Sequence, residues 1–293
     1  MIDFEYHHPT NLDEVFGLLD QYSEDARVMA GGTALVIQMK QRLVQPSHVI
    51  GLRRIGSLNT IEKTSEGVKI GALCTQRQIQ NSSVVGGELP LLADTFRKVA
   101  TPRIRNMATI GGGLVNGDPN QDPPPTLIAL GASVVMTSKN GDRVVPVEDL
   151  FIDYYETDVQ PGEVLTSVLV PQAPAGSGSV YLKFLPRTAD DYGTVCVAAV
   201  ISQERDGSCK DARIVLGAVG VTPVRATQAE EALRGKLLTD ENIRAAAALV
   251  EDAVDPLEDF RGSAEYKTEV AEVFTRRAIE QAIALIPSGT AGT

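Results

Sequence analysis

Cysteine is scarce in this sequence, which limits the redox chemistry that the chain can perform alone. Only Cys74, Cys196 and Cys209 occur among 293 residues, scattered and odd in number. They form no disulfide framework and fit a reducing compartment, so a cytoplasmic protein is expected. An iron–sulfur cluster needs about four closely spaced cysteines, which excludes a cluster held by this chain. Each cysteine is instead predicted to be a small core residue.

Positive charge and long apolar runs are also lacking. The formal net charge is -11, and because a protein that grips a nucleic-acid backbone needs a basic face, nucleic acid is not an expected partner. No apolar run approaches the length of a transmembrane helix. The first residues, MIDFEY, lack the basic patch and apolar stretch of a signal peptide. With 43% hydrophobic and 22% charged residues, the composition is that of a globular protein with a sizeable core.

The first part of the chain is predicted to be a mixed α+β domain. A helix is expected from Thr10, which with Asp13 resembles a capping box. A hairpin is expected around Asn140-Gly141, between strands at 133–138 and 143–147. The proline-rich run DPNQDPPP at 118–125 is expected to be irregular. Further expected elements are strands at 26–30, 48–52 and 68–75 and helices at 35–40 and 89–100.

A second, smaller domain is expected after residues 172–179, QAPAGSGS, whose composition is typical of a linker. Two strands, 194–203 and 212–220, are expected to join through Asp206-Gly207, with three helices after them. Gly235 is expected to cap the first helix, Thr239 to begin the second and Ser263 the third. The predicted division is a domain at 1–175, a second α+β domain of antiparallel strands plus helices at 180–286, and a flexible tail at 287–293.

Two glycine-rich stretches are the candidates for binding a phosphate. Residues 30–34, AGGTA, follow an expected strand and precede an expected helix. Such a turn points backbone N–H groups at an anion, and Thr33 could cap the helix, although an ordinary strand-to-helix turn is an equal alternative. The second stretch, TIGGG at 109–113, lets two glycine turns clamp one pyrophosphate. Neither fits the Rossmann fingerprint, because the sixth position from Gly111 is Asn116, and Gly235-Lys236 lacks the rest of a Walker pattern.

Other polar residues carry weaker hypotheses. His7-His8 could suggest a metal, but adjacent histidines point apart in a strand and no third ligand lies nearby in sequence, so a surface position is favoured and no metal site is predicted. Arg103 and Arg105 could neutralise a phosphate, contact a partner or form a solvated salt bridge. Asp118 and Asp122 have no base-and-nucleophile set around them, so no catalytic residue is predicted.

Three motifs resemble those of one protein family. Residues 104–112, IRNMATIGG, resemble the IRN-x-ATIGG motif of the FAD-binding subunit of molybdenum hydroxylases, a family that includes carbon monoxide dehydrogenase and xanthine dehydrogenase. Residues 30–33 resemble the same family's first flavin loop. Residues 261–267, RGSAEYK, resemble its RGSAEYR segment, and TRRA at 275–278 resembles the continuation. The similarity extends over essentially residues 1–285.

The resemblance implies a flavin domain of the vanillyl-alcohol-oxidase (PCMH-like) type, followed by the family's C-terminal domain, with FAD as the cofactor. It implies pyrophosphate contacts from both glycine stretches, an Asp122 contact to the ribityl chain, Tyr192 near the isoalloxazine and Lys183 at the flavin edge. The chain departs from the family at Gly113, where an asparagine is common; the two alternatives are that Asn116 supplies the hydrogen bond instead or that the loop has a different conformation. The candidate residues are Ala30, Gly31, Gly32, Thr33, Ala34, Thr109, Ile110, Gly111, Gly112, Asn116, Asp122, Lys183 and Tyr192.

The implied function is electron transfer within a complex. In such complexes the substrate is hydroxylated at a molybdopterin centre in a large subunit, and electrons cross two-iron iron–sulfur clusters in a small subunit to FAD. The resemblance implies a dimer of heterotrimers in which this chain is inactive alone. Because the flavin must lie near a cluster, a partner is expected at the face beside the second glycine stretch, including the stiff proline-rich run at 118–125. The alternatives are a free-standing FAD-dependent oxidoreductase of the same fold, such as the cell-wall enolpyruvyl-sugar reductase, and a nucleotide-binding module without catalysis.

Overall fold

The computed structural model describes residues 1–185, 187–188 and 192–287, which form two compact units. The first unit contains Met1–Glu88, Thr101–Asp118 and Ala132–Val170. The second contains Leu89–Ala100, Pro119–Gly131 and the chain from Pro171 onward. The units are therefore interleaved in sequence, because two helical segments upstream of residue 171 pack with the C-terminal part. The predicted tail residues 288–293 lie outside the described residues.

The first unit contains two main sheets. Its helices are α1 Leu12–Tyr22, α2 Leu35–Lys40, α3 Gln76–Asn81, α4 Ser83–Glu88, α6 Pro102–Arg105, α7 Ile110–Asn116 and α9 Val147–Leu150. Its strands are β1 Glu5–His7, β2 Ala26–Met29, β3 His48–Gly51, β4 Ile61–Lys63, β5 Gly67–Gly71, β6 Ser133–Ser138, β7 Gly141–Pro146, β8 Phe151–Asp153, β9 Glu156–Thr157 and β10 Val164–Pro171. One sheet has the order β1-β3-β2, another β4-β5-β10-β6-β7, and β8 pairs with β9.

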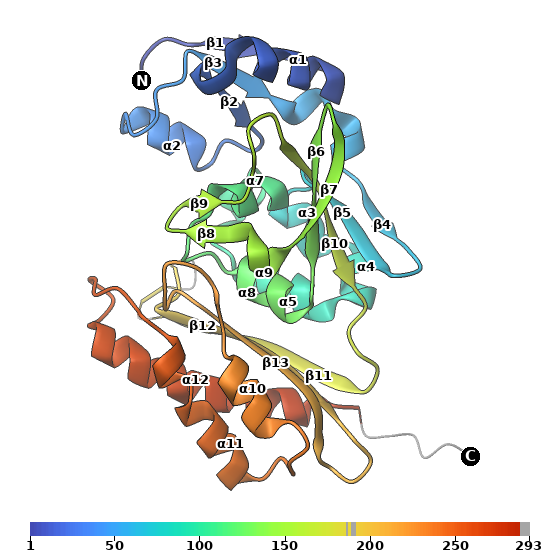
Figure 1. Cartoon of the computed structure of the whole chain (residues 1–293), viewed down its shortest axis with the longest axis vertical. Coiled ribbons are helices and arrows are strands. Elements are labelled where there is room, and N and C mark those ends of the chain that lie inside the picture. The colour runs from blue at the N-terminus through green and yellow to red at the C-terminus, as the bar shows by residue number, and fades with distance from the viewer. Residues whose placement is uncertain (186, 189–191, 288–293) are drawn as a thin grey trace. The chain divides into compact units, whose positions relative to one another are not determined.

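The β1-β3-β2 sheet is parallel and packs against α1 (Figure 1). Val15 and Phe16 of α1 and Ile50 of β3 are buried together. The predicted cap of this helix, Thr10, was wrong by one residue, because Asn11 is the cap and the helix begins at Leu12. The Asn11 side chain accepts the hydrogen bond from the Glu14 N–H, and the Thr10 N–H and hydroxyl donate to the Glu14 carboxylate instead.

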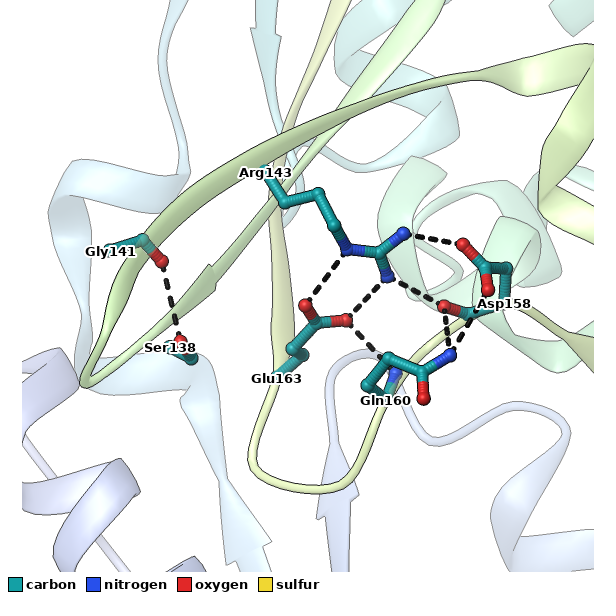
Figure 2. A network of polar contacts seen from close by, with 6 residues as sticks. All are labelled: Ser138, Gly141, Arg143, Asp158, Gln160 and Glu163. Carbon is teal, nitrogen blue, oxygen red and sulfur yellow. Dashed lines mark hydrogen bonds and ion pairs between the residues drawn. The ribbon is translucent and has the colours of Figure 1, made fainter.

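The hairpin predicted at Asn140-Gly141 is confirmed as β6 and β7. Gly141 has φ +120°, a conformation that glycine adopts without strain. Figure 2 shows how Arg143 of β7 ties this hairpin to the loop before β10. Its guanidinium forms a bidentate pair with Glu163, with N···O distances of 3.0 and 2.7 Å, and also donates to the Asp158 carboxylate. These hydrogen bonds hold the pKa of Asp158 and of Glu163 below its usual range and raise the pKa of Arg143.

The second unit is a four-stranded sheet covered on both faces. Its helices are α5 Pro90–Lys98, α8 Pro123–Ala129, α10 Thr227–Leu233, α11 Asp240–Ala248 and α12 Ala264–Ala284. Its strands are β11 Ser177–Phe184, β12 Val195–Gln203, β13 Cys209–Gly217 and β14 Val224–Arg225, antiparallel in that order. Helices α10 and α12 pack on one face and α5 and α8 on the other (Figure 1). Strand β12 is therefore buried along almost its whole length, which explains its continuous apolar sequence.

Two sequence predictions for this region need correction. The run at 118–125 was expected to be irregular, but its last three prolines begin helix α8. Proline is tolerated there because the first turn of a helix does not use its N–H groups. The linker predicted at 172–179 extends too far, because β11 already begins at Ser177. Two strands were expected here, but the sheet has four, because β11 and β14 were not predicted.

The expected helix ends of the second unit are confirmed. Gly235 follows α10 with φ +76°, which glycine accepts at a helix C-terminus. Thr239 accepts a hydrogen bond from the Asn242 N–H at the start of α11, and Ser263 accepts one from the Tyr266 N–H at the start of α12. Among the described residues, no helix is long and apolar enough to cross a membrane.

The three cysteines are free thiols in the core, as predicted. Burial raises the pKa of Cys74 and of Cys209 to about 11 and that of Cys196 to about 12. A thiol with so high a pKa is almost entirely protonated near neutral pH, and only the thiolate is an effective nucleophile. The cysteines are therefore packing residues.

Candidate functional site

The first glycine stretch is the turn between β2 and α2. Gly32 has φ +72°, a left-handed conformation that favours glycine. The N-cap of α2 is Ala34, which makes no side-chain capping bond, so the expected capping role of Thr33 was wrong. Within the described parts of the chain, the backbone N–H groups of Gly32, Thr33 and Ala34 donate to no acceptor. Half-buried donors without partners at the start of a helix favour an anion.

The second glycine stretch is the first turn of a helix rather than a glycine turn. Helix α7 begins at Ile110, and the Thr109 hydroxyl caps it by accepting from the Gly112 N–H at 3.1 Å. The N–H groups of Ile110 and Gly111 donate to the carbonyls of residues 74 and 72. Because these donors are used internally, residues 110–112 have no N–H group left to bind a ligand.

The two glycine stretches touch each other inside the first unit. A Cβ atom on Gly31 would lie 1.9 Å from the carbonyl oxygen of Met107, so the backbones are in direct contact. A Cβ on Gly112 would lie 3.3 Å from the Cβ of Ala30. On its other side Gly111 packs on Ala72, where an added Cβ would lie 2.6 Å from the alanine methyl. The glycines of the two motifs are thus required by close packing as well as by any ligand.

Further contacts hold the segment after α7. The Asn116 side-chain oxygen accepts a hydrogen bond from the Gln38 amide at 3.2 Å, which ties α7 to α2. Gly117 ends the helix with φ +63° and lies against the backbone of Tyr155. Burial, together with the nearby Asp118 carboxylate, raises the pKa of Tyr155 to about 12. The β8–β9 hairpin therefore packs on the end of the second stretch.

Asp122 and Lys183 form an ion pair within the second unit, where both side chains are almost fully buried at 4% and 2% exposure. The Asp122 carboxylate accepts hydrogen bonds from the Lys183 ammonium at 3.0 Å and from the Tyr181 hydroxyl. Burial raises the pKa of Asp122, and the Lys183 charge opposes that shift. The Lys183 ammonium also donates to the Lys98 carbonyl, and the Lys98 ammonium donates to the Tyr181 carbonyl. This network joins α5, α8 and β11.

Sequence reasoning missed Tyr181 and Lys98 as partners of this pair. A signal for Tyr181 was present, because residues 181 and 183 alternate along a strand and so point to the same face.

Tyr192 is 46% exposed, with the Arg261 guanidinium 5.7 Å from its ring centroid. The adjoining residues 189–191 lie outside the described residues. The glycine stretches belong to the first unit, and Asp122, Lys183 and Tyr192 to the second.

The candidate site fits the pyrophosphate of a dinucleotide. At the start of α2 stand three N–H donors that have no acceptor among the described residues. No carboxylate occurs in the stretches 30–34 and 109–113 to repel a phosphate. In this region the arrangement supplies hydrogen-bond donors and shape, and no nucleophile or general base.

Comparison with known proteins covers nearly the whole chain. The family model described as the FAD binding domain in molybdopterin dehydrogenase matches residues 2–173, and the CO dehydrogenase flavoprotein C-terminal domain matches residues 180–282. The carbon monoxide dehydrogenase medium chain of Afipia carboxidovorans is 40% identical over 95% of this chain and 96% of its own. The alpha subunit of the 6-hydroxypseudooxynicotine dehydrogenase complex of Paenarthrobacter nicotinovorans is 32% identical, over 96% of this chain and 94% of its own.

The solved structures give the same result. A chain of carbon monoxide dehydrogenase from Hydrogenophaga pseudoflava, in a form that lacks the Mo-pyranopterin moiety of the molybdenum cofactor, superposes with a TM-score of 0.94. It is 39% identical, over 98% of this chain and all of that chain. The expected α+β fold, an FAD-binding domain followed by a smaller C-terminal domain, is thereby confirmed.

Proposed function

Because this chain belongs to the family of FAD-binding medium subunits of molybdenum hydroxylases, we propose that it relays electrons from iron–sulfur clusters of a small subunit to an external acceptor. Bound FAD supplies the chemistry, since a flavin accepts and releases electrons singly or in pairs. The chain's own residues bind the cofactor, orient it and limit its access to solvent. The substrate is oxidised elsewhere in the complex.

The observation that best supports this proposal is the direct contact between the two glycine stretches. The free N–H groups of Gly32, Thr33 and Ala34 are suited to donate to the pyrophosphate, and α2 adds the favourable end of its dipole. The second stretch, from Thr109 to Gly112, would form a second wall beside the cofactor, as the family resemblance implies, because it lies against the first stretch. Ala30 and Gly31 keep the two walls in contact.

We assign the remaining candidates to other parts of FAD on the strength of the family resemblance. Asn116 would hydrogen-bond the cofactor beside the second stretch, and Asp122 would approach the ribityl chain. Lys183 would lie at the flavin edge and Tyr192 near the isoalloxazine. Since the Asp122 carboxylate already accepts from two internal donors, we propose that it acts mainly by holding the surrounding backbone in place.

The flavin assignment is tested by a charge-only comparison at Gly32. Aspartate and asparagine meet the same left-handed backbone and the same contact with the Met29 sulfur, 3.0 Å from an added Cβ, and they differ by one negative charge. Gly32→Asp should lose FAD because its carboxylate would face the pyrophosphate, whereas Gly32→Asn should retain much more. Cys209→Ser, in the core of the second unit, should leave flavin content unchanged. Equal FAD content in the aspartate and asparagine variants would refute this placement of the pyrophosphate.

The released cofactor gives a second, direct test. Denaturing the purified protein should release FAD as the only flavin and no iron–sulfur cluster, because the chain has three scattered cysteines that are buried and unsuited to a cluster. Release of FMN without FAD, or recovery of tightly bound iron, would contradict the proposal.

We propose two kinds of partner: a large subunit that carries molybdopterin and a small subunit that carries two-iron iron–sulfur clusters, arranged as a cytoplasmic dimer of heterotrimers. The relatives are named for complexes that act on different compounds, carbon monoxide and 6-hydroxypseudooxynicotine. The large subunit's pocket would therefore select the substrate. The run at 118–125 is a poor docking surface, contrary to our expectation, because Asp118, Pro119 and the three prolines of α8 are buried.

Co-expression tests the partner proposal. The chain should be expressed with and without the products of its neighbouring genes, followed by measurements of mass and of substrate-dependent dye reduction. The chain alone should bind FAD and reduce no dye, and the complex should do both. A stable monomer that oxidises substrate unaided would instead identify a free-standing flavoenzyme.

A further inference from the structure

Three side chains with metal-binding chemistry come together at one edge of the first unit, in a place unrelated to the glycine stretches. They are Glu5, His7 and His48, which offer one ligand atom each within 4.8 Å of one another. The sequence shows only the adjacent pair His7-His8, which by itself argued against a metal. We propose that Glu5, His7 and His48 form a binding site for a divalent transition-metal ion of the Zn²⁺ class.

The parallel pairing of β1 with β3 creates this cluster. Glu5 lies directly opposite His48 in the strand register, and His7 lies two residues after Glu5. Because side chains alternate along a strand, Glu5 and His7 project from the same face of β1. Residue 48 is therefore the ligand that no local sequence pattern could reveal.

The interatomic distances suit a shared ion. The His7 Nε2 and His48 Nδ1 atoms are 3.1 Å apart. Two nitrogen ligands of a tetrahedral zinc ion, each about 2.05 Å from the metal, are separated by about 3.3 Å. The Glu5 carboxylate lies 3.6 Å from His48 Nδ1 and 4.0 Å from His7 Nδ1. The His7 nitrogen nearest Glu5 is not the one that contacts His48, so a shared ion requires rotation of the exposed Glu5 side chain or of the His7 ring. One ligand atom of each residue already lies within 4.8 Å of the others.

Both imidazoles are held in place before any ion binds. The Tyr22 ring stacks on His48 with centroids 3.6 Å apart and lies 5.2 Å from His7. The histidine side chains are 13% and 19% exposed, whereas that of Glu5 is 64% exposed. Ordered nitrogens on one side and a movable carboxylate on the solvent side leave room for water as a further ligand. Two imidazoles and one carboxylate favour Zn²⁺, Co²⁺, Ni²⁺ or Cu²⁺ over Mg²⁺ and Ca²⁺.

An ion here would fasten β1 to β3, which would strengthen a short edge strand at the N-terminus. It would have no part in electron transfer, so the proposal stands apart from the flavin function. Without an ion, the 3.1 Å contact is a hydrogen bond between the two imidazoles, and the experiment distinguishes these two states.

The test is calorimetric titration of Zn²⁺ into tag-free, FAD-loaded protein that has been treated with a chelator. We expect one ion per chain with micromolar affinity, and no comparable binding of Mg²⁺. His7→Gln, His48→Gln and Glu5→Gln should each weaken binding roughly tenfold or more, since the loss of even an outer-sphere partner costs about that much. His8→Gln is the matched control, because His8 is exposed and packs on Tyr6 instead.

A spectroscopic measurement on the unaltered protein makes the test independent of variant folding. Cu²⁺ bound at this site should show hyperfine coupling to two nitrogen donors in its EPR spectrum. The proposal is overturned if Zn²⁺ does not bind stoichiometrically, if the His8→Gln control loses binding equally, or if the copper spectrum shows only oxygen donors. FAD content should stay constant across the four variants.

Discussion

Gly31→Ala should separate the two glycine stretches and release the cofactor. The added methyl group would stand 1.9 Å from the Met107 carbonyl oxygen, and real Cβ atoms essentially never approach another heavy atom within 3.0 Å. The backbones must therefore move apart by more than about 1 Å. Since the obstacle is backbone, it cannot rotate away as the end of a flexible side chain could.

The energetic cost follows from that displacement. Overpacking a well-packed site usually costs about 1–3 kcal/mol, and a backbone obstacle places Gly31→Ala at the upper end of that range. The shift also moves the N–H donors of the first stretch away from the second wall. FAD content should consequently fall more steeply than stability.

Gly17→Ala provides the matched control for this substitution. Gly17 is an exposed residue inside α1, and a Cβ there meets nothing within 4 Å. This variant should gain about 0.5–1 kcal/mol, because alanine in a helix loses less conformational entropy than glycine. FAD per chain is measured by visible absorbance, and stability by urea unfolding followed through far-UV circular dichroism, which does not depend on bound flavin. Wild-type FAD content and an unchanged midpoint in Gly31→Ala would refute the reasoning.

Three further predictions concern charge and burial. Lys183→Met should destabilise the second unit by about 3–5 kcal/mol, measured by urea unfolding, because it leaves the Asp122 carboxylate buried without its cation; a double variant with Asp122→Leu should recover most of the loss. Arg143 lowers the pKa of Glu163, so the stability from this pair is fully present above the ordinary carboxyl range and is lost as pH falls through the lowered value. The gap in unfolding midpoint between the wild type and Glu163→Gln should thus shrink between pH 6 and pH 3, and a constant gap would contradict this cause. The three cysteines should react slowly with a thiol reagent at pH 8 and rapidly after unfolding, whereas fast labelling of the native protein would contradict their burial.

The sequence alone determined those features that depend on residues close together in the chain. The Asn140-Gly141 hairpin, the glycine after α10 and the caps at Thr239 and Ser263 each involve hydrogen bonds or backbone angles within a few positions. The first glycine stretch was recognised as a strand-to-helix turn for the same reason, because the strand, the turn and the helix follow one another directly in the sequence. The family also followed from the sequence, because its motifs are short strings in a fixed order.

Only the tertiary structure decided how distant segments meet. The contact of Gly31 with Met107 spans two stretches that no local pattern connects. The second stretch was predicted to be a glycine turn, but it is the first turn of α7. The carbonyls of residues 72 and 74, which are distant in sequence, accept hydrogen bonds from its first N–H groups. The Pro123–Ala129 helix and the Asp122–Lys183 pair are likewise buried only because this part of the chain packs against the sheet of the second unit.

The candidate metal cluster illustrates the difference most simply. Glu5 and His7 are visible in the sequence as alternate residues, but nothing near them supplies another nitrogen ligand on their face. His48 joins them only because β1 pairs with β3 in one particular register. A shift by one residue would turn His48 to the opposite face of the sheet. The local sequence favours a strand, whereas packing of the whole unit determines the register in which that strand pairs.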